Sequence, residues 1–166
     1  MNVRLARAVD SEPVAGIYNQ GIADRGATFE TEPRTAADMA RRIEEDSERF
    51  PVLVAEEEGV ILGWASIGLY RERRCYAGVG EFSVYIHRDA RGRAVGRELL
   101  AELIVEARRR GYWKLLSRVF PSNAASLALC RALGFREVGT YEKHGRLDGK
   151  WLDVVIVERL IPENQP

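Results

Sequence analysis

The chain has 166 residues, of which 46% are hydrophobic and 30% are charged. This composition is that of a folded domain with a core, and it excludes a disordered, collagen-like or coiled-coil chain. Lys and Arg together number 25, as do Asp and Glu, so the formal net charge at pH 7 is zero. A zero net charge favours neither nucleic acid nor an anionic membrane as a partner, so any affinity for anions must be local.

Two patterns that would indicate other classes of protein are missing. No apolar run approaches the roughly 20 residues that a membrane-spanning helix needs, and residues 1–8 lack the apolar core of a signal peptide. We therefore expect a cytoplasmic protein. The two cysteines, Cys75 and Cys130, and the two histidines, His87 and His144, have no spacing typical of metal ligands. We expect no metal site, no disulfide framework, and no membrane or nucleic-acid partner.

The first half of the chain predicts a strand, two helices and a β-hairpin. The apolar spacing places these elements, in order, at 3–8, 11–22, 35–47, 51–56 and 60–67. Thr35, with Asp38 three residues later, resembles a capping box at the start of the second helix. The segment 25–34 between the two helices is typical of a loop, and it carries the large aromatic side chain of Phe29.

The second half predicts a strand at 81–86, a helix from the 91–96 turn to Gly111, a strand at 114–119, a helix at 122–133 and strands at 136–141 and 151–160. The helix before Gly111 has the clearest amphipathic spacing. The resulting order, β-α-α-β-β-β-α-β-α-β-β, predicts an α+β fold with a mixed, mostly antiparallel sheet and flanking helices. We expect residues 1–161 to form a single domain and residues 162–166 a short, loose C-terminal tail.

The turn between the 81–86 strand and the following helix is the most informative stretch of the chain. A strand that enters a small-residue turn opening a helix directs several backbone N–H groups at one point, where the helix dipole adds positive charge. Such a turn can hold a pyrophosphate. It lacks the spacing of a nucleotide P-loop and of a dinucleotide-binding fingerprint. On spacing alone, a tight turn before a cationic helix start explains the residues equally well.

Residues 91–96 (RGRAVG) resemble the Q/R-x-x-G-x-G/A signature of the GCN5-related N-acetyltransferase (GNAT) family. Residues 123–135 are similar to the second motif of that family, NxxSxxLYxxxGF, in the expected order and separation. The resemblance implies the GNAT fold, acetyl-CoA as co-substrate and no metal, with the loop amides holding the pyrophosphate. Ala94 replaces the first glycine of the signature, which the turn tolerates if this residue keeps a negative φ.

Other segments resemble the phosphinothricin and methionine sulfoximine acetyltransferase branch of the family, and the match covers nearly the whole chain. These segments are 18–19, 27–33, 70–73 and 81–86, while 143–153 is similar to relatives that acetylate arsinothricin. The resemblance implies N-acetylation of the α-amino group of a small amino acid that bears a second anionic or tetrahedral head group. It also implies a role in detoxification or resistance, and a homodimer.

Glu81 is the candidate general base. Acetyl transfer needs an unprotonated amine, whereas a free α-amine is mostly ammonium at neutral pH, so a base must remove a proton. A carboxylate in an otherwise apolar strand is expected to hold a proton more tightly than one in water, which suits this task. The residues alone favour an ion pair between Glu81 and one of the many arginines, and the resemblance shifts our interpretation to the base.

The resemblance also implies which residues bind the cofactor. They are Val84, Tyr85, Ile86, Gly92, Arg93, Ala94, Val95, Gly96, Arg97, Asn123 and Ser126. A backbone N–H near Val84 would stabilise negative charge on the thioester oxygen. Asn123 is also suited to cap a helix, and both roles can coexist. Cys130 stands where many relatives have a tyrosine that protonates the departing thiolate, and we interpret it as an apolar wall residue.

Arg71 and Arg73 are candidates for binding the amino-acid substrate. Alternate residues of an extended segment face the same side, and guanidinium groups match the oxygens of a carboxylate or phosphinate. The resemblance places both arginines at the amino-acid pocket, together with Phe29 and Tyr76. The alternative is a solvated basic loop. Asp148 replaces a histidine of some relatives, and we assign it no catalytic role.

Two other functions are compatible with the same residues. One is an acetyltransferase of this fold that acts on another amine, such as a protein N-terminus or a polyamine, although Arg71 and Arg73 argue against a polyamine. The other is a sensor that binds acyl-CoA without catalysing transfer.

Overall fold

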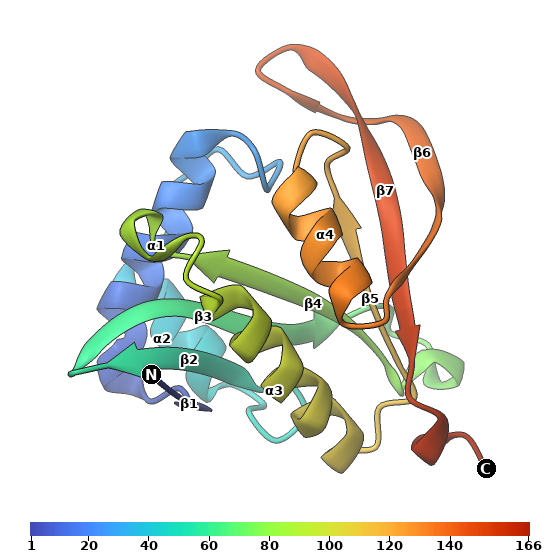
Figure 1. Ribbon diagram of the computed structural model, residues 1–166, viewed down its shortest axis with the longest axis horizontal. Helices are drawn as coiled ribbons and strands as arrows, with labels where there is room; N and C mark the ends of the chain where they lie inside the picture. Colours follow the sequence, from blue (N-terminus) through green and yellow to red (C-terminus); the bar gives the residue numbers. More distant parts are fainter.

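The computed structural model describes all 166 residues, and one sheet of seven strands organises them (Figure 1). The strands are β1 (Asn2–Leu5), β2 (Val52–Glu57), β3 (Val60–Leu69), β4 (Val79–Ile86), β5 (Lys114–Val119), β6 (Arg136–Leu147) and β7 (Lys150–Leu160). The helices are α1 (Ser11–Asp24), α2 (Ala36–Glu44), α3 (Val95–Arg109) and α4 (Ala124–Ala132). None of the helices has both the length and the apolar character needed to cross a membrane.

The strand order in the sheet is β1-β2-β3-β4-β5-β7-β6, and β4 with β5 is the parallel pair among antiparallel neighbours. This arrangement confirms the predicted order of elements and the α+β class. The capping box is also present, because the Thr35 side chain accepts from the backbone of Asp38 and the Asp38 side chain accepts in return. The third and fourth helices begin and end within a few residues of their predicted bounds.

Two hydrophobic clusters lie on opposite faces of the sheet, because successive side chains of a strand point to opposite sides. On β3, Ala65 and Ile67 belong to the cluster that packs against α3, and Trp64 belongs to the cluster beneath α1 and α2. Leu99 and Leu103 of α3 are completely buried. Burial of each such side chain contributes roughly 1.5–3 kcal/mol relative to an exposed one, so α3 is firmly attached to the sheet.

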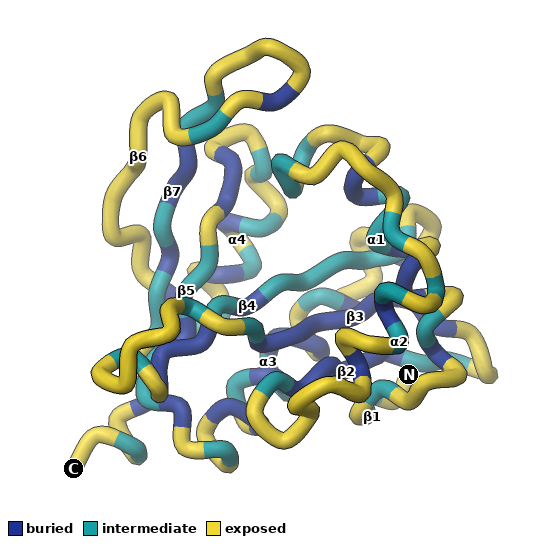
Figure 2. The backbone as a smooth tube through the Cα atoms, turned by 180° about the vertical axis from the view of Figure 1, so that it is seen from behind, coloured by how far each residue is buried: buried dark blue, intermediate teal, exposed yellow.

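The parallel pair β4–β5 separates soon after it forms. Val79–Glu81 pairs with Lys114–Leu116, and beyond these residues the two strands have no register. Figure 1 shows the two arrows diverging from this point. In Figure 2 the second half of β4 is intermediate in burial although the strand lies in the middle of the sheet. The divergence therefore opens the centre of the sheet to solvent or to a ligand.

The expectation of a loose C-terminal tail is wrong. Ile161 is 2% exposed, and the side-chain amide of Asn164 donates hydrogen bonds to the carbonyls of Arg108 and Tyr112, both at 2.8 Å. The last carbonyls of a helix lack partners within the helix, so Asn164 satisfies the end of α3. Residues 162–166 are held against the domain by this cap, and the buried side chain of Ile161 anchors the chain directly before them.

Candidate active site

Two cavities flank the opening between β4 and β5. The larger has a volume of about 660 Å³ and is bounded by the N-terminal turn of α3, by α4 and by α1. The smaller has a volume of about 330 Å³ and is lined by Glu81, Ser83, Arg118 and Phe29. The cavities share wall residues: Ala27, Val84, Tyr85, Asn123, Ser126 and Leu129. They are therefore two compartments of one cleft that passes between the diverging strands.

The N-terminal turn of α3 presents free backbone donors to the larger cavity. None of the backbone N–H groups from Gly92 to Arg97 donates a hydrogen bond within the chain. Gly92 and Ala94 have φ angles of 76° and 63°, which direct successive N–H groups toward the same side. Together with the positive end of the α3 dipole, these groups form a site for a phosphate or pyrophosphate.

Ala94 does not keep the negative φ that would make the replacement of glycine free of strain. The residue is left-handed at the N-cap of α3. For a residue with a side chain this conformation costs roughly 1–2 kcal/mol. Gly92 is left-handed as well, and the two positive φ angles together direct the amides of the turn toward the cavity. Gly96 also fits closely, since a Cβ there would lie 3.3 Å from Leu129 of α4.

Ion pairs hold the turn before α3 against the rest of the domain. Asp24 at the end of α1 accepts from Arg88 at 2.5 Å and from Arg91 at 2.9 Å. Hydrogen bonds from these two guanidinium groups lower the pKa of Asp24 below its ordinary value. Arg93 pairs with Glu57 at 2.5 Å, so its guanidinium is engaged, while its backbone N–H is free for an anion.

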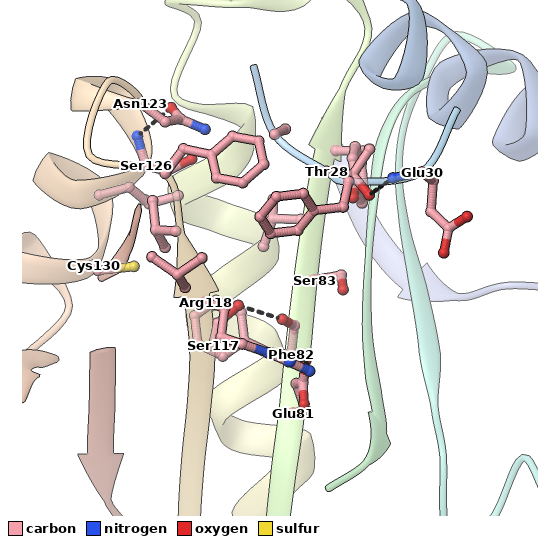
Figure 3. Close-up of a pocket in the computed structure, with 18 of the residues that line it drawn as sticks. Thr28, Glu30, Glu81, Phe82, Ser83, Ser117, Arg118, Asn123, Ser126 and Cys130 are labelled. Atoms are coloured by element: carbon pink, nitrogen blue, oxygen red, sulfur yellow. Dashed lines mark hydrogen bonds and ion pairs between the residues drawn. The ribbon is translucent and has the colours of Figure 1, made fainter. Parts of the chain in front are cut away.

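The opened edge of β4 offers unpaired backbone groups. The hydroxyl of Ser117 on β5 donates to the carbonyl of Phe82 at 2.8 Å, which shows that the backbone groups of Phe82 face β5 (Figure 3). Backbone groups of alternate strand residues point the same way, so Val84 and Ile86 also face this side, beyond the end of the β5 register. Val84 and Ile86 can therefore hydrogen-bond an extended amide chain that lies in the cleft.

Glu81 lies where the strands begin to separate. Arg118 of β5 donates to Oε1 of Glu81 from Nη2 at 2.7 Å and from Nε at 3.2 Å. The ion pair that we considered as an alternative for Glu81 is thus present. Both bonds reach the same oxygen, and Oε2 has no partner in the chain. The Glu81 side chain is 25% exposed and lines the smaller cavity, so a basic oxygen is available there.

Phe29 forms the opposite wall of the smaller cavity. Its ring packs edge-on against Phe120, with 4.8 Å between centroids, and a Cβ added to Gly145 of β6 would lie 2.8 Å from it. The loop that carries Phe29 is attached to α1, because the side chain of Asn19 bonds both the carbonyl and the N–H of Arg34, at 2.9 and 2.8 Å. The wall is therefore fixed from both sides.

The structure does not bring Arg71, Arg73 and Tyr76 into the cleft with Glu81. They lie in the connection between β3 and β4, where Arg71 stacks over Tyr70 at 5.2 Å and Arg73 over Tyr76 at 5.8 Å. Both arginines are exposed, as in the solvated-loop alternative. A hydrogen bond with Tyr70 raises the pKa of Arg71 above its ordinary value. Their role in substrate binding stays a prediction.

Asn123 and Ser126 meet at the start of α4, where both line the two cavities. Oδ1 of Asn123 accepts from the backbone N–H of Ser126 at 3.2 Å (Figure 3), which is the predicted helix cap. The cap leaves the Asn123 amide nitrogen and the Ser126 hydroxyl free to face a ligand. Cys130, one turn further along, is 3% exposed, and burial raises the pKa of its thiol to about 11. Asp148 is paired with Arg25 at 2.9 Å, away from the cleft.

Several cleft residues were not singled out from the sequence. Ser83 follows Glu81 by two positions and shares its face of β4, so strand alternation alone could have identified it. Arg118 and Phe120 had no such signal, because only the parallel pairing of β5 with β4 brings them to Glu81. No group of three His, Cys, Asp or Glu side chains is arranged to hold a metal ion.

Three features define the class of protein. They are the split central sheet, the free amides at the start of the helix after the split strand, and the carboxylate at the split. Residues 17–135 match the model of the acetyltransferase (GNAT) family, and the chain belongs to this family. Transfer of an acetyl group is therefore its chemistry.

Individual acetyltransferases are similar to this chain over nearly its full length. The chain is 34% identical to an L-methionine sulfoximine/L-methionine sulfone acetyltransferase of Salmonella typhimurium, over 99% of this chain and 96% of the relative. A crystal structure of a ribosomal-protein-alanine N-acetyltransferase from Brucella melitensis superposes with a TM-score of 0.93 at 36% identity, covering 97% of this chain and 100% of the other. A phosphinothricin acetyltransferase from Sinorhizobium meliloti in complex with AcCoA gives 0.90 at 31% identity, covering 96% and 88%.

Proposed function

We propose that this protein transfers the acetyl group of acetyl-CoA to the α-amino group of a small amino acid of the methionine sulfoximine or phosphinothricin type. The observation that carries the proposal is the row of free N–H groups from Gly92 to Arg97, which lies at one end of a cleft with Glu81 at the other. A diphosphate and an acceptor amine can thus be bound at the two ends of one channel.

The residues of the larger cavity fit the donor. The amides of residues 92–97 would hold the pyrophosphate, and the backbone of Val84 and Ile86 would bond the pantetheine arm as an added strand. Asn123 and Ser126 have polar atoms free to contact the same arm. Acetyl-CoA supplies a thioester carbonyl at the split of the sheet, and the Val84 N–H would donate to its oxygen as negative charge develops.

Glu81 is proposed as the base. Its Oε2 would accept a proton from the acceptor ammonium, directly or through one water, and the free amine would attack the carbonyl carbon. The tetrahedral intermediate would then break its C–S bond and release coenzyme A thiolate, and the proton left on the nitrogen would pass to that thiolate or to solvent. The ion pair with Arg118 fixes the carboxylate in place and leaves Oε2 without a partner in the chain. Cys130 lines the cavity as a protonated thiol. Because coenzyme A thiolate is itself a good leaving group, the reaction does not require an acid at this position.

The acceptor class rests on the names of the relatives together with the small size of the second cavity. Methionine sulfoximine and phosphinothricin acetyltransferases are similar to this chain over nearly its full length, and a free amino acid fits a volume of about 330 Å³. Phe29 would cover the acceptor, with Tyr76, Arg71 and Arg73 contributing from the connection after β3. Arsinothricin is a further candidate acceptor, and acetylation of such compounds would detoxify them.

We also propose a homodimer, for which the β6–β7 hairpin is the candidate interface. β6 is an edge strand, and Tyr141 and Trp151 on the hairpin are 53% and 57% exposed. Light scattering after size exclusion measures the mass, and charged substitutions at these two positions should yield monomer. We propose further that the chain is one cytoplasmic domain, since acetyl-CoA is an intracellular cofactor and both cysteines are free thiols.

Thiol release tests the function. The protein is mixed with acetyl-CoA and, separately, with methionine sulfoximine, phosphinothricin, arsinothricin, spermidine or a peptide that begins with alanine. Among these acceptors, we expect only the three amino acids to give thiol release, and we expect mass spectrometry to detect their N-acetyl products. If only the peptide or only spermidine gave thiol release, that amine would be the acceptor in place of the proposed amino acid. Saturable binding of acetyl-CoA without thiol release for any amine would indicate a sensor.

A further inference from the structure

Four side-chain positions on β3 and β4 form a strip beside the smaller cavity. Glu81 and Ser83 of β4 line this cavity, and their register partners on β3 are Gly68 and Ser66. Partners across an antiparallel pair point to the same face of the sheet. The strip is therefore on the face covered by α1 and α2, and Gly68 leaves room above β3 because it has no side chain.

Arg42 of α2 reaches over this strip. Its Nη2 donates to the hydroxyl of Ser66 at 2.7 Å, and the same nitrogen lies 3.7 Å from the Cβ position of Gly68. Ser66 is completely buried, so the guanidinium that bonds it lies directly against the sheet. Glu81 is the register partner of Gly68 on the neighbouring strand, and neighbouring strands lie roughly 4.8 Å apart.

Arg42 has no acidic partner. The preceding residue, Arg41, pairs with Asp38 at 2.6 Å, whereas the Arg42 side chain donates to the neutral hydroxyl of Ser66. Burial lowers the pKa of the guanidinium, and Tyr18 and Tyr85, whose hydroxyls act in the opposite direction, also line the smaller cavity. The residue is nevertheless exposed, so a solute can reach it.

A guanidinium that is held in place by a neutral hydroxyl, has no acidic partner and is open to solvent is suited to bind a carboxylate. Every α-amino acid carries such an anion on the carbon that bears its amine. We propose that Arg42 binds the α-carboxylate of the acceptor, while Glu81 faces the amine one strand away. The proposal rests on the proposed amino-acid acetylation and adds to it a residue that recognises free amino acids as a class.

This assignment separates the roles of the arginines. Arg42 lies over β3 before the strand ends, and Arg71 and Arg73 follow after its end, on the far side of Gly68. The α-carboxylate would then be held at Arg42, leaving the later arginines for the phosphinate or sulfoximine head of the side chain. The competing explanation is that Arg42 only ties α2 to Ser66.

The test compares methionine sulfoximine with its α-carboxamide in steady-state thiol-release assays of the full chain. The enzymes are the wild type, Arg42→Gln, Arg42→Lys and the matched control Arg41→Gln. The measured quantity is the ratio of the two acceptor KM values in each enzyme, because the amide also changes the basicity of the amine. Thermal unfolding of each variant is recorded alongside.

We expect Arg42→Gln to raise the KM for methionine sulfoximine about 10- to 100-fold and to leave the KM for acetyl-CoA unchanged. The ratio of the KM values for the acid and the amide should approach that of an enzyme that does not recognise the carboxylate. Arg42→Lys should retain part of the preference, and Arg41→Gln all of it. An unchanged ratio in Arg42→Gln, or equal losses for both acceptors with a lowered Tm, would overturn the assignment. If Arg42→Gln does not fold, a wild-type ratio in Arg42→Lys overturns it instead. Absence of thiol release in the wild type would count against the proposed function itself.

Discussion

Arg118 donates two hydrogen bonds to a single oxygen of Glu81 across the mouth of the split between β4 and β5. Glu81 is the last β4 residue in register with β5, and Arg118 lies two residues beyond its partner Leu116. The ion pair therefore bridges the strands where they diverge. It fixes the carboxylate without using its second oxygen, which keeps a proton acceptor at the entrance to the cleft.

Glu81→Gln should lower kcat by roughly 10²- to 10⁴-fold, the usual contribution of a general base. The loss should be largest at neutral pH, where the acceptor is ammonium, and should shrink as the pH approaches the pKa of the amine. Thiol release measured from pH 6 to pH 9.5 checks both statements. The control is Glu137→Gln, which removes a carboxylate that is also paired with an arginine, at 2.6 Å, outside the cleft. A pH-independent loss would contradict the assigned role.

Arg71→Ala should raise the KM for the amino acid about tenfold or more, as expected for loss of a hydrogen bond to a charged group. The KM for acetyl-CoA should not change, because Arg71 lies after β3 and away from the α3 turn. Initial rates with each substrate varied in turn measure the two constants. The neighbouring exposed Arg74 provides the comparison, through Arg74→Ala. Equal increases for both substrates would remove Arg71 from the acceptor site.

Gly145→Ala should impair acceptor binding through Phe29. The new methyl group would lie 2.8 Å from the Phe29 ring, closer than two carbon atoms can approach, so the ring must move into the smaller cavity. Gly139→Ala on the same strand is a matched control, since no atom lies within 4 Å of its Cβ position. We expect a several-fold higher acceptor KM for the first variant alone, at unchanged KM for acetyl-CoA. Similar kinetics for both variants would show that Phe29 does not line the acceptor site.

The sequence was most informative where local pattern and burial agree. The strand at 114–119 has its predicted bounds, α3 follows its apolar spacing, and the capping box of Thr35 is formed. The predictions failed where pairing partners decide the structure. β6 continues past Tyr141 to Leu147 through polar residues that have no strand pattern, because β7 pairs again with residues 145–147 after an irregularity at 142–144.

The same distinction applies to the candidate site. Motif spacing identified the α3 turn and Asn123, whose contacts are local in the sequence. The left-handed φ of Ala94 follows from the geometry of the whole turn, and the contacts of Arg118 and Arg42 cross between elements distant in the chain. A pattern within one segment of the chain does not predict contacts with a distant segment. These contacts were therefore found only in the three-dimensional structure.

The two thiols should react very differently. Cys75 is exposed, and Cys130 is buried with its pKa raised to about 11, so at pH 8 the Cys130 thiol is protonated and only 3% exposed. Iodoacetamide should label Cys75 in the native protein and should label Cys130 only after unfolding, as read by peptide mass spectrometry. Cys130→Ala should retain most of kcat, because the thiol serves as a wall of the cavity. Rapid native labelling of Cys130, or a large loss of kcat, would contradict this interpretation.

The pH dependence of stability should reveal the ion pair of Asp10. Arg4 donates to both carboxylate oxygens of Asp10, at 2.8 and 2.9 Å, the backbone N–H of Arg7 donates at 2.7 Å, and the Asp10 side chain is 6% exposed. The hydrogen bonds from Arg4 lower the pKa of Asp10, and burial opposes them. A lowered folded-state pKa stabilises the protein above the unfolded-state value of about 3.9, and the stabilisation is lost as the pH falls through the folded-state value.

Asp10→Asn should therefore reduce the free energy of unfolding by about 1–3 kcal/mol at pH 7, and the difference from wild type should shrink below about pH 4. Urea unfolding at pH 7, 5 and 3 measures both. Asp89→Asn is the control, since its side chain is 93% exposed and its loss should have no measurable effect at any of these pH values. A difference between Asp10→Asn and wild type that stays constant down to pH 3 would mean that the ionised carboxylate is not the stabilising species.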